Sequence, residues 1–274
     1  MKPFIDTLNV LLPILYIITF IIYSYDFGRG NNKYANSKRL FLFITLLVHL
    51  SYLLLRTMKF EHPPITNVFE IFTVIAFAIA FSYFILELLT DIRGTGPFII
   101  IFSVLFQTIS SIFITDEFFV KEVLKNNLLG FHVFTALIGY SAITISAVYG
   151  FLYLMLYKEI KTNRFGLIYE RMPNLEVLEQ LSFYSAVIGF AMLTIAIIIG
   201  LIWLPQAFPK FSFIDPKIIG TALVWILYGV GILSKVLGKW QGKKLVAILI
   251  GGFLIAILST MVTNFISQSF HSFY

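Results

Sequence analysis

Histidine is the residue type in this chain best suited to binding a metal ion, because its neutral ring nitrogens are strong ligands. The 274 residues contain four histidines and no cysteine. His62 and His271 lie beside long apolar stretches, His132 lies at the start of one, and His49 lies in the middle of one. Polar groups in or beside a bilayer are costly unless they are paired, so each histidine is a candidate functional residue. A solitary histidine at a helix end is nevertheless more often an interfacial side chain than a ligand.

An aromatic loop adds to this set. Residues 203–225 read WLPQAFPKFSFIDPKIIGTALVW and join two apolar runs. Because proline cannot continue a helix, we expect one helix to end near Trp203 and the next to begin near Asp215, with Pro216 in its first turn. The simpler interpretation of such a loop is an interfacial aromatic belt.

Histidines and aromatic residues on one face of a membrane protein favour haem binding. Two imidazoles can ligate haem iron from opposite sides, while aromatic walls contact the porphyrin and cations pair with its propionates. Lys210 and Lys217 are the candidate cations. The two ligating nitrogens would lie about 4 Å apart, because each metal–imidazole bond is about 2 Å long. Zinc is the alternative, but no cysteine and few nearby acids are present to complete four ligands.

The composition places the chain among membrane proteins. Hydrophobic residues make up 59% of the chain and charged residues 12%, whereas soluble domains carry about 25% charged residues. Apolar runs of about 18 residues or more are typical of transmembrane helices. We therefore expect an all-α, polytopic membrane helix bundle that forms a single domain over residues 1–274. The lack of cysteine excludes disulfides, thiolate metal sites and thiol–disulfide exchange.

Eight apolar runs are long enough to cross a bilayer. They comprise residues 8–25, 40–58, 68–90, 97–115, 129–157, 182–203, 218–236 and 246–266. Before the sixth run, Asn174 is a candidate N-cap and leucines recur every third residue, which predicts a short amphipathic helix over 172–182. Between the second and third runs, Asn67 and Glu70 have the spacing of a capping box.

The basic residues predict the orientation, because cytoplasmic loops are enriched in lysine and arginine. One side of the predicted bundle carries 13 of the 20 basic residues: Arg29, Lys33, Lys38, Arg39, Arg93, Lys158, Lys161, Arg164, Arg171, Lys235, Lys239, Lys243 and Lys244. We expect that side to be cytoplasmic in an inner (cytoplasmic) membrane. Both termini and the 204–217 loop then lie on the outer side, together with His62, His132 and His271. This distribution also accounts for the net charge of +6 without nucleic-acid binding.

Five segments carry a family resemblance. They are PITNVFE from Pro64, FHVFTALIGYSAITISAVYGFLYL from Phe131, MPNLEVLEQLSFYSAVIGFAMLT from Met172, DPKIIGTALVWILY from Asp215, and the C-terminal FHSF. PITNVFE is similar to P-x-S-N-x-Y-E, and DPKIIGTALVWILY to D-P-K-E-x-x-A-L-I-T-W-L-I-Y. These are motifs of the CcsA/CcmC/CcmF family of haem-handling proteins in cytochrome c assembly. The short, eight-span chain also resembles the related protein HemX.

The resemblance implies which residues form the site. It implies that His132 and His271, in the segments that carry the family's two external histidines, are the axial ligands of a transiently bound haem b. The family's loop reads W-G-x-Y-W-x-W-D. In this chain Trp203 and Asp215 match it, and the departures are Phe208, Phe211, Ser212 and Ile214. We expect Trp203, Phe208, Phe211 and Asp215 to belong to the haem-binding loop. Leu233 stands where the family has an intramembrane histidine.

The function that the resemblance implies is haem handling in c-type cytochrome biogenesis. Such a protein binds or presents haem at the outer face for attachment to apocytochrome c, within a haem lyase complex rather than as a stand-alone enzyme. A CcsB-like assembly partner and membrane lipid are the implied contacts. Two alternatives stay open: a HemX-like regulator of haem biosynthesis, and a small-solute transporter. Transport is disfavoured because no pair of broken helices recurs in two halves and few buried acids are expected.

Overall fold

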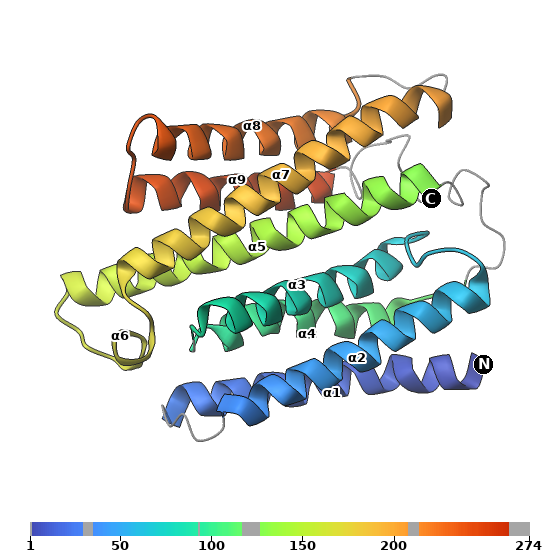
Figure 1. Cartoon of the computed structure of the whole chain (residues 1–274), viewed down its shortest axis with the longest axis horizontal. Helices are drawn as coiled ribbons and strands as arrows, with labels where there is room; N and C mark the ends of the chain where they lie inside the picture. Colours follow the sequence, from blue (N-terminus) through green and yellow to red (C-terminus); the bar gives the residue numbers. More distant parts are fainter. Residues whose placement is uncertain (1, 30–34, 93, 117–126, 208–213, 263–274) are drawn as a thin grey trace. The chain divides into compact units, whose positions relative to one another are not determined.

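The computed structural model describes residues 2–29, 35–92, 94–116, 127–207 and 214–262. Within these ranges eight helices are long and apolar enough to cross a membrane, which confirms the predicted all-α, multi-pass bundle (Figure 1). The helices are α1 (Lys2–Arg29), α2 (Ala35–Phe60), α3 (Val68–Thr90), α4 (Gly96–Phe113), α5 (Asn127–Lys161), α6 (Leu167–Arg171), α7 (Leu175–Ala207), α8 (Pro216–Val236) and α9 (Lys243–Met261). All of them except the short α6 are candidate membrane spans.

The helices pack into two compact units. Unit 1 comprises Met1–Asn126 and Phe165–Pro173, and unit 2 comprises Asn127–Arg164 and Asn174–Tyr274. In unit 1, α1 and α3 each pack against both α2 and α4. In unit 2, α5 and α8 each pack against both α7 and α9, and the α5–α7 contact is the most extensive. Each unit is therefore a ring of four membrane-spanning helices.

The predicted helix starts at Asn67 and Asp215 are confirmed. Asn67 Oδ1 accepts a hydrogen bond from the backbone N–H of Glu70 at 2.8 Å. In return Glu70 Oε2 accepts from the N–H of Thr66 at 2.8 Å, so the capping box closes one residue earlier than in its usual form. Asp215 Oδ1 accepts from the N–H of Lys217 at 2.8 Å, and Pro216 is the first residue of α8.

Two features of α7 differ from the sequence prediction. The amphipathic segment is not a separate helix, because α7 runs without interruption from Leu175 to Ala207. Asn174 still caps it, accepting from the N–H of Val177 at 2.9 Å. The helix also continues four residues beyond Trp203, and Pro205 lies in its last turn. A proline removes one backbone donor, but at a helix end this costs less than in the interior.

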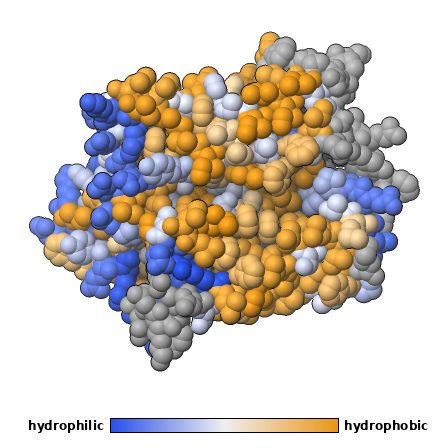
Figure 2. All heavy atoms as spheres, in the orientation of Figure 1, coloured by the Kyte–Doolittle hydropathy of each residue, from blue (hydrophilic) through white to orange (hydrophobic). Residues whose placement is uncertain are grey.

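The surface of the helices is mostly apolar. Figure 2 shows hydrophobic side chains over the middle of the helices and hydrophilic side chains gathered toward the helix ends. Large side chains such as Leu54 and Ile198 are more than half exposed in the protein itself. Such exposure is costly in water but is expected where lipid is the solvent.

Close contact between α5 and α7 depends on glycine. A Cβ at Gly189 of α7 would lie 2.8 Å from Ile143 Cγ1 of α5, and one at Gly139 would lie 3.0 Å from Leu193. Small residues let transmembrane helices approach closely and gain packing contacts. Ile143 and Leu193 then join Val224 and Leu249 in the apolar core of unit 2.

Candidate functional site

His132 lies in the second turn of α5 and is partly buried against α7. Its Nδ1 is 2.8 Å from the backbone oxygen of Ala196. A carbonyl oxygen accepts hydrogen bonds but cannot donate them, so the proton of the neutral ring must be on Nδ1. Nε2 consequently keeps its lone pair, and no side chain in the described ranges is hydrogen-bonded to it.

Because Gly200 has no side chain, it leaves space for the His132 ring. It follows Ala196 by one helical turn, and a Cβ there would lie 3.0 Å from His132 Cε1 and 3.1 Å from Nδ1. Any larger residue would press on the imidazole. Our sequence analysis missed both Ala196 and Gly200, although their spacing to Trp203 places all three on one face of α7.

Two predicted loop residues lie within the same unit. Trp203 is buried near the end of α7, on the face that carries Ala196 and Gly200. Asp215 is also buried and caps α8. Lys217 lies in the first turn of α8, which begins at the end of unit 2 where α5 also begins and α7 ends (Figure 1). His132, Trp203 and the start of α8 therefore gather at one end of unit 2.

The remaining predicted site residues lie outside the described residues. These are His271, Phe208 and Phe211, together with Lys210 and Ser212. The predicted pairing of His132 with His271 thus stays a prediction.

The other two histidines have different roles. His49 is fully buried in unit 1, with Nδ1 2.9 Å from the Tyr16 hydroxyl and Nε2 2.9 Å from the Thr73 hydroxyl. His62 Nδ1 donates to the carbonyl of Pro63 at 2.9 Å. Both nitrogens of His49 are used within the protein, so it is not prepared to ligate a metal.

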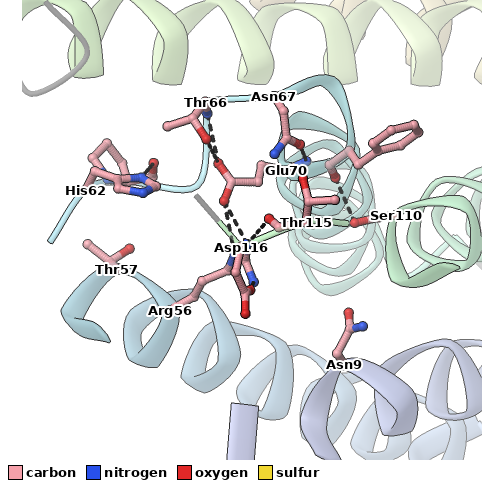
Figure 3. Close-up of polar contacts among 12 residues, drawn as sticks. Asn9, Arg56, Thr57, His62, Thr66, Asn67, Glu70, Ser110, Thr115 and Asp116 are labelled. Atoms are coloured by element: carbon pink, nitrogen blue, oxygen red, sulfur yellow. Dashed lines mark hydrogen bonds and ion pairs between the residues drawn. The ribbon is translucent and has the colours of Figure 1, made fainter. Parts of the chain in front are cut away.

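A polar cluster in unit 1 gives Glu70 a role besides capping α3 (Figure 3). Arg56 donates to Glu70 Oε1 from Nε at 3.1 Å and from Nη2 at 2.9 Å, and to Asp116 Oδ1 at 3.2 Å. The second oxygen of Glu70 accepts from both the backbone and the hydroxyl of Thr66. The PITNVFE segment therefore fixes the α2–α3 connection as well as capping α3. The Arg56 partner was missed, because nothing in the local sequence relates residues 56 and 70.

The described residues contain no metal site built from several protein side chains. Among the residues that the structure describes, no group of three or more histidine or acidic side chains is arranged to hold a metal ion. A haem needs only one or two side-chain ligands, because the porphyrin supplies the other four.

Comparison with known proteins decides the family. Residues 34–271 match the family model described as cytochrome C assembly protein. The chain belongs to this family.

Curated members of the cytochrome c assembly family are similar over nearly the whole chain. The cytochrome c biogenesis protein CcsA of Mesostigma viride is 24% identical over 285 residues, covering 94% of this chain and 93% of that protein. CcsA of Guillardia theta is 24% identical over 229 residues, covering 77% and 76%. Protein HemX of Bacillus subtilis (strain 168) is 25% identical over 272 residues, covering 95% of each. This multi-pass membrane protein therefore has a role in cytochrome c biogenesis.

Proposed function

We propose that the chain binds haem at the end of unit 2 that carries His132 and presents it for attachment to apocytochrome c. The observation that carries this proposal is the hydrogen bond from His132 Nδ1 to the carbonyl of Ala196. Metal-ligating histidines usually donate their second ring N–H to such an oxygen, which fixes the tautomer and ring orientation and raises ligand basicity. His132 Nε2 is thereby suited to bind iron, and His271 is the proposed second ligand.

Each neighbouring residue has a task in this proposal. Trp203, with Phe208 and Phe211 of the following loop, provides apolar surface for a porphyrin. Asp215 fixes the first turn of α8 through its cap and so positions Lys217 to pair with a propionate. Imidazole ligands bind the haem iron reversibly and form no bond to the porphyrin. A histidine of the client cytochrome can therefore displace one of them.

The proposal includes a side of the membrane and a partner. From the excess of basic residues on the opposite side, we propose that His132 and the 204–217 loop face outward. Reporter fusions at Tyr274 and near Lys161 should then report opposite sides. A cytoplasmic Tyr274 would contradict external haem presentation. A CcsB-like protein is the proposed assembly partner.

The direct test is the absorption spectrum of the purified protein. We expect the parent protein to copurify with haem. His132→Gly and His271→Gly should each lose it, and added imidazole should restore the spectrum by replacing the missing ligand. His62→Gly is the matched control and should leave the spectrum unchanged, because His62 bonds to Pro63 instead. A haem-loaded parent whose spectrum neither substitution changes would refute the axial pair.

A HemX-like regulatory function is the second candidate. It is favoured by the similarity to HemX over 95% of each chain and by the departures at Phe208 and Phe211 from the family's tryptophan-rich loop. The same preparation separates the two functions. A parent protein that never carries haem, even from haem-supplied membranes, would support regulation of haem biosynthesis without haem transfer.

A further inference from the structure

The surface that α7 and α8 form together in unit 2 carries an apolar groove. Its volume is about 340 Å³, and small-molecule sites span about 300–1,000 Å³. The Phe190 ring of α7 stacks on the Trp225 ring of α8, with centroids 5.2 Å apart. Gly229 lies one turn after Trp225, and a Cβ there would be 3.3 Å from Phe190 Cε2. Because glycine has no side chain, the groove stays open beside the two rings.

The lining of the groove suits a hydrocarbon chain. Ile226, Val230 and Leu233 of α8 also line it, and they are between 46% and 57% exposed. The indole N–H of Trp225 donates to the Thr194 hydroxyl at 2.8 Å, so it is already used within the protein. The residues that line the groove include no imidazole, thiol or carboxylate that could ligate a metal. A polar ligand would lose its hydrogen bonds to water there, whereas an apolar chain would not.

The groove continues along one stripe of α8 to the end of the helix. Ile226, Val230, Leu233 and Leu237 follow one another at spacings of four, three and four, so they share a face. At about 1.5 Å per residue, this stripe is about 17 Å long. The hydrocarbon core of a bilayer is about 30 Å thick, so the stripe matches the acyl region of one leaflet.

The α8–α9 loop at the end of this stripe is basic. From Pro216 to Tyr274 the sequence contains no aspartate or glutamate. Lys239 and Lys244 are exposed, and neither makes a hydrogen bond or ion pair within the described part of the chain. Trp240 between them is 42% exposed, and tryptophan is enriched at the headgroup level of bilayers. Two ammonium groups are therefore available where lipid headgroups lie.

Contacts within unit 2 hold the α8–α9 loop in place. Glu179 of α7 accepts from Lys235 Nζ at 2.7 Å and from the N–H of Gly242 at 2.7 Å. The N–H of Trp240 donates to the carbonyl of Ser234 at 2.9 Å. Glu179 thus pairs with one lysine and fixes the start of α9, which leaves the two exposed lysines to an external anion. Groups that are already positioned lose less freedom on binding.

We propose that α7 and α8 bind one anionic phospholipid, with an acyl chain in the groove and the phosphate group beside Lys239 and Lys244. Charge complementarity favours an anionic headgroup, because no acid in the α8–α9 loop opposes these two lysines. The groove accounts for the acyl chain, which free phosphate and acidic proteins lack. The site lies at the end of α8 opposite to Pro216, and it does not depend on haem binding.

Quenching of tryptophan fluorescence by lipids with brominated acyl chains tests the proposal. Trp203→Phe and Trp240→Phe leave Trp225 as the single tryptophan of the full-length chain. This protein is reconstituted into phosphatidylcholine vesicles that contain a minor fraction of brominated phosphatidylglycerol or the same fraction of brominated phosphatidylcholine. We expect the anionic lipid to quench Trp225 at least about threefold more, because the lysines concentrate it beside the groove.

The headgroup contact is tested by removing charge. Lys239→Gln with Lys244→Gln should make the two brominated lipids quench Trp225 equally. Lys161→Gln with Arg164→Gln is the matched control, because it removes the same charge from exposed positions at the end of α5 and just after it. The control should keep the preference for the anionic lipid.

The acyl-chain contact is tested by filling the groove. In Gly229→Leu the new side chain lies beside Phe190 and excludes the acyl chain, so the ratio of the two quenching values should fall toward one. Gly251→Leu on α9 is the control, since nothing lies within 4 Å of its Cβ position. It should leave the ratio unchanged.

Four results would overturn the proposal. The first is equal quenching by both lipids in the single-tryptophan protein. The second is weak quenching by both, as expected if a second copy of the chain covered the groove. The third is loss of the preference in both pairs of charge variants, which would indicate general surface charge. The fourth is an unchanged preference in folded Gly229→Leu. If that variant does not fold, the exposed Lys239 and Lys244 still decide the question.

Discussion

His49 in unit 1 and His132 in unit 2 are both held by hydrogen bonds between helices, but they differ in what is left unbonded. His49 uses both ring nitrogens, toward Tyr16 and Thr73. His132 uses Nδ1 toward Ala196, and the described residues make no hydrogen bond to its Nε2. Whether a buried histidine can bind a ligand therefore depends on the hydrogen-bond partner of its second ring nitrogen, and not on burial alone.

The two units that contain these histidines also differ in which polar side chains they bury. Among the described residues of unit 1, four charged side chains are buried in ion pairs between helices: Lys38, Arg56, Glu70 and Glu87. The buried polar side chains described in unit 2 are serine and threonine hydroxyls and Asp215. The expectation of few buried acids agrees with the described residues, among which the buried acids are Glu70, Glu87 and Asp215. The two acids of unit 1 can be buried because each has a cation within ion-pair distance on a neighbouring helix.

The comparison predicts the largest loss of stability where a buried ion pair in unit 1 is broken. Glu70→Ala leaves the Arg56 guanidinium buried with a weaker set of partners, so we expect the free energy of unfolding to fall by about 3 kcal/mol or more. Lys235→Met in unit 2 removes a partly exposed partner of Glu179 and should cost about 1 kcal/mol or less. Reversible unfolding in mixed detergent micelles, followed by circular dichroism, measures both. Equal losses would contradict the contrast between the units.

Replacing each of the two histidines by leucine should lower the free energy of unfolding by different amounts. His49→Leu leaves the Tyr16 and Thr73 hydroxyls without their imidazole partner, and we expect a loss of about 2 kcal/mol. His132→Leu should cost under about 1 kcal/mol, because the Ala196 carbonyl keeps its bond within α7. The same unfolding experiment checks the difference. A larger loss for His132→Leu would show that this residue is mainly structural.

A smaller effect is expected from one added methyl group next to His132. In Gly200→Ala the new Cβ meets the imidazole at 3.0 Å and must displace it. If haem binds as proposed, its dissociation constant should rise about tenfold, which corresponds to about 1.4 kcal/mol. Gly130→Ala on α5 is the control, because nothing lies within 4 Å of its Cβ position. Unchanged haem titration in Gly200→Ala, with a haem-binding parent, would show that the ring position does not control binding.

The smallest expected effect concerns the helix cap of α7. Asn174→Ala removes the acceptor for the N–H of Val177 and should lower the free energy of unfolding by about 1 kcal/mol. Gln180→Ala, six residues further on at an exposed position, should change it by less than about 0.5 kcal/mol. Similar values for the two variants would mean that the bilayer surface, and not the cap, fixes the start of α7.

Local chemistry in the sequence determined much of the architecture. The eight apolar runs predicted the eight membrane-spanning helices, because a helix must be about 20 apolar residues long to cross the hydrocarbon core. Asn67 and Asp215 predicted where α3 and α8 begin, because a capping side chain bonds to backbone groups two or three residues away. The motifs from PITNVFE to DPKIIGTALVWILY predicted the cytochrome c assembly family.

Only the tertiary structure decided how the polar residues are used. Arg56 and Glu70, like His49 and Tyr16, are far apart in sequence and meet because α1, α2 and α3 pack side by side. Likewise, no pattern along the chain shows that the partner of His132 is a backbone carbonyl at Ala196, with Gly200 leaving space for the ring. Hydrogen bonds act over about 3 Å in space, whereas sequence patterns report neighbours within a few turns of one helix.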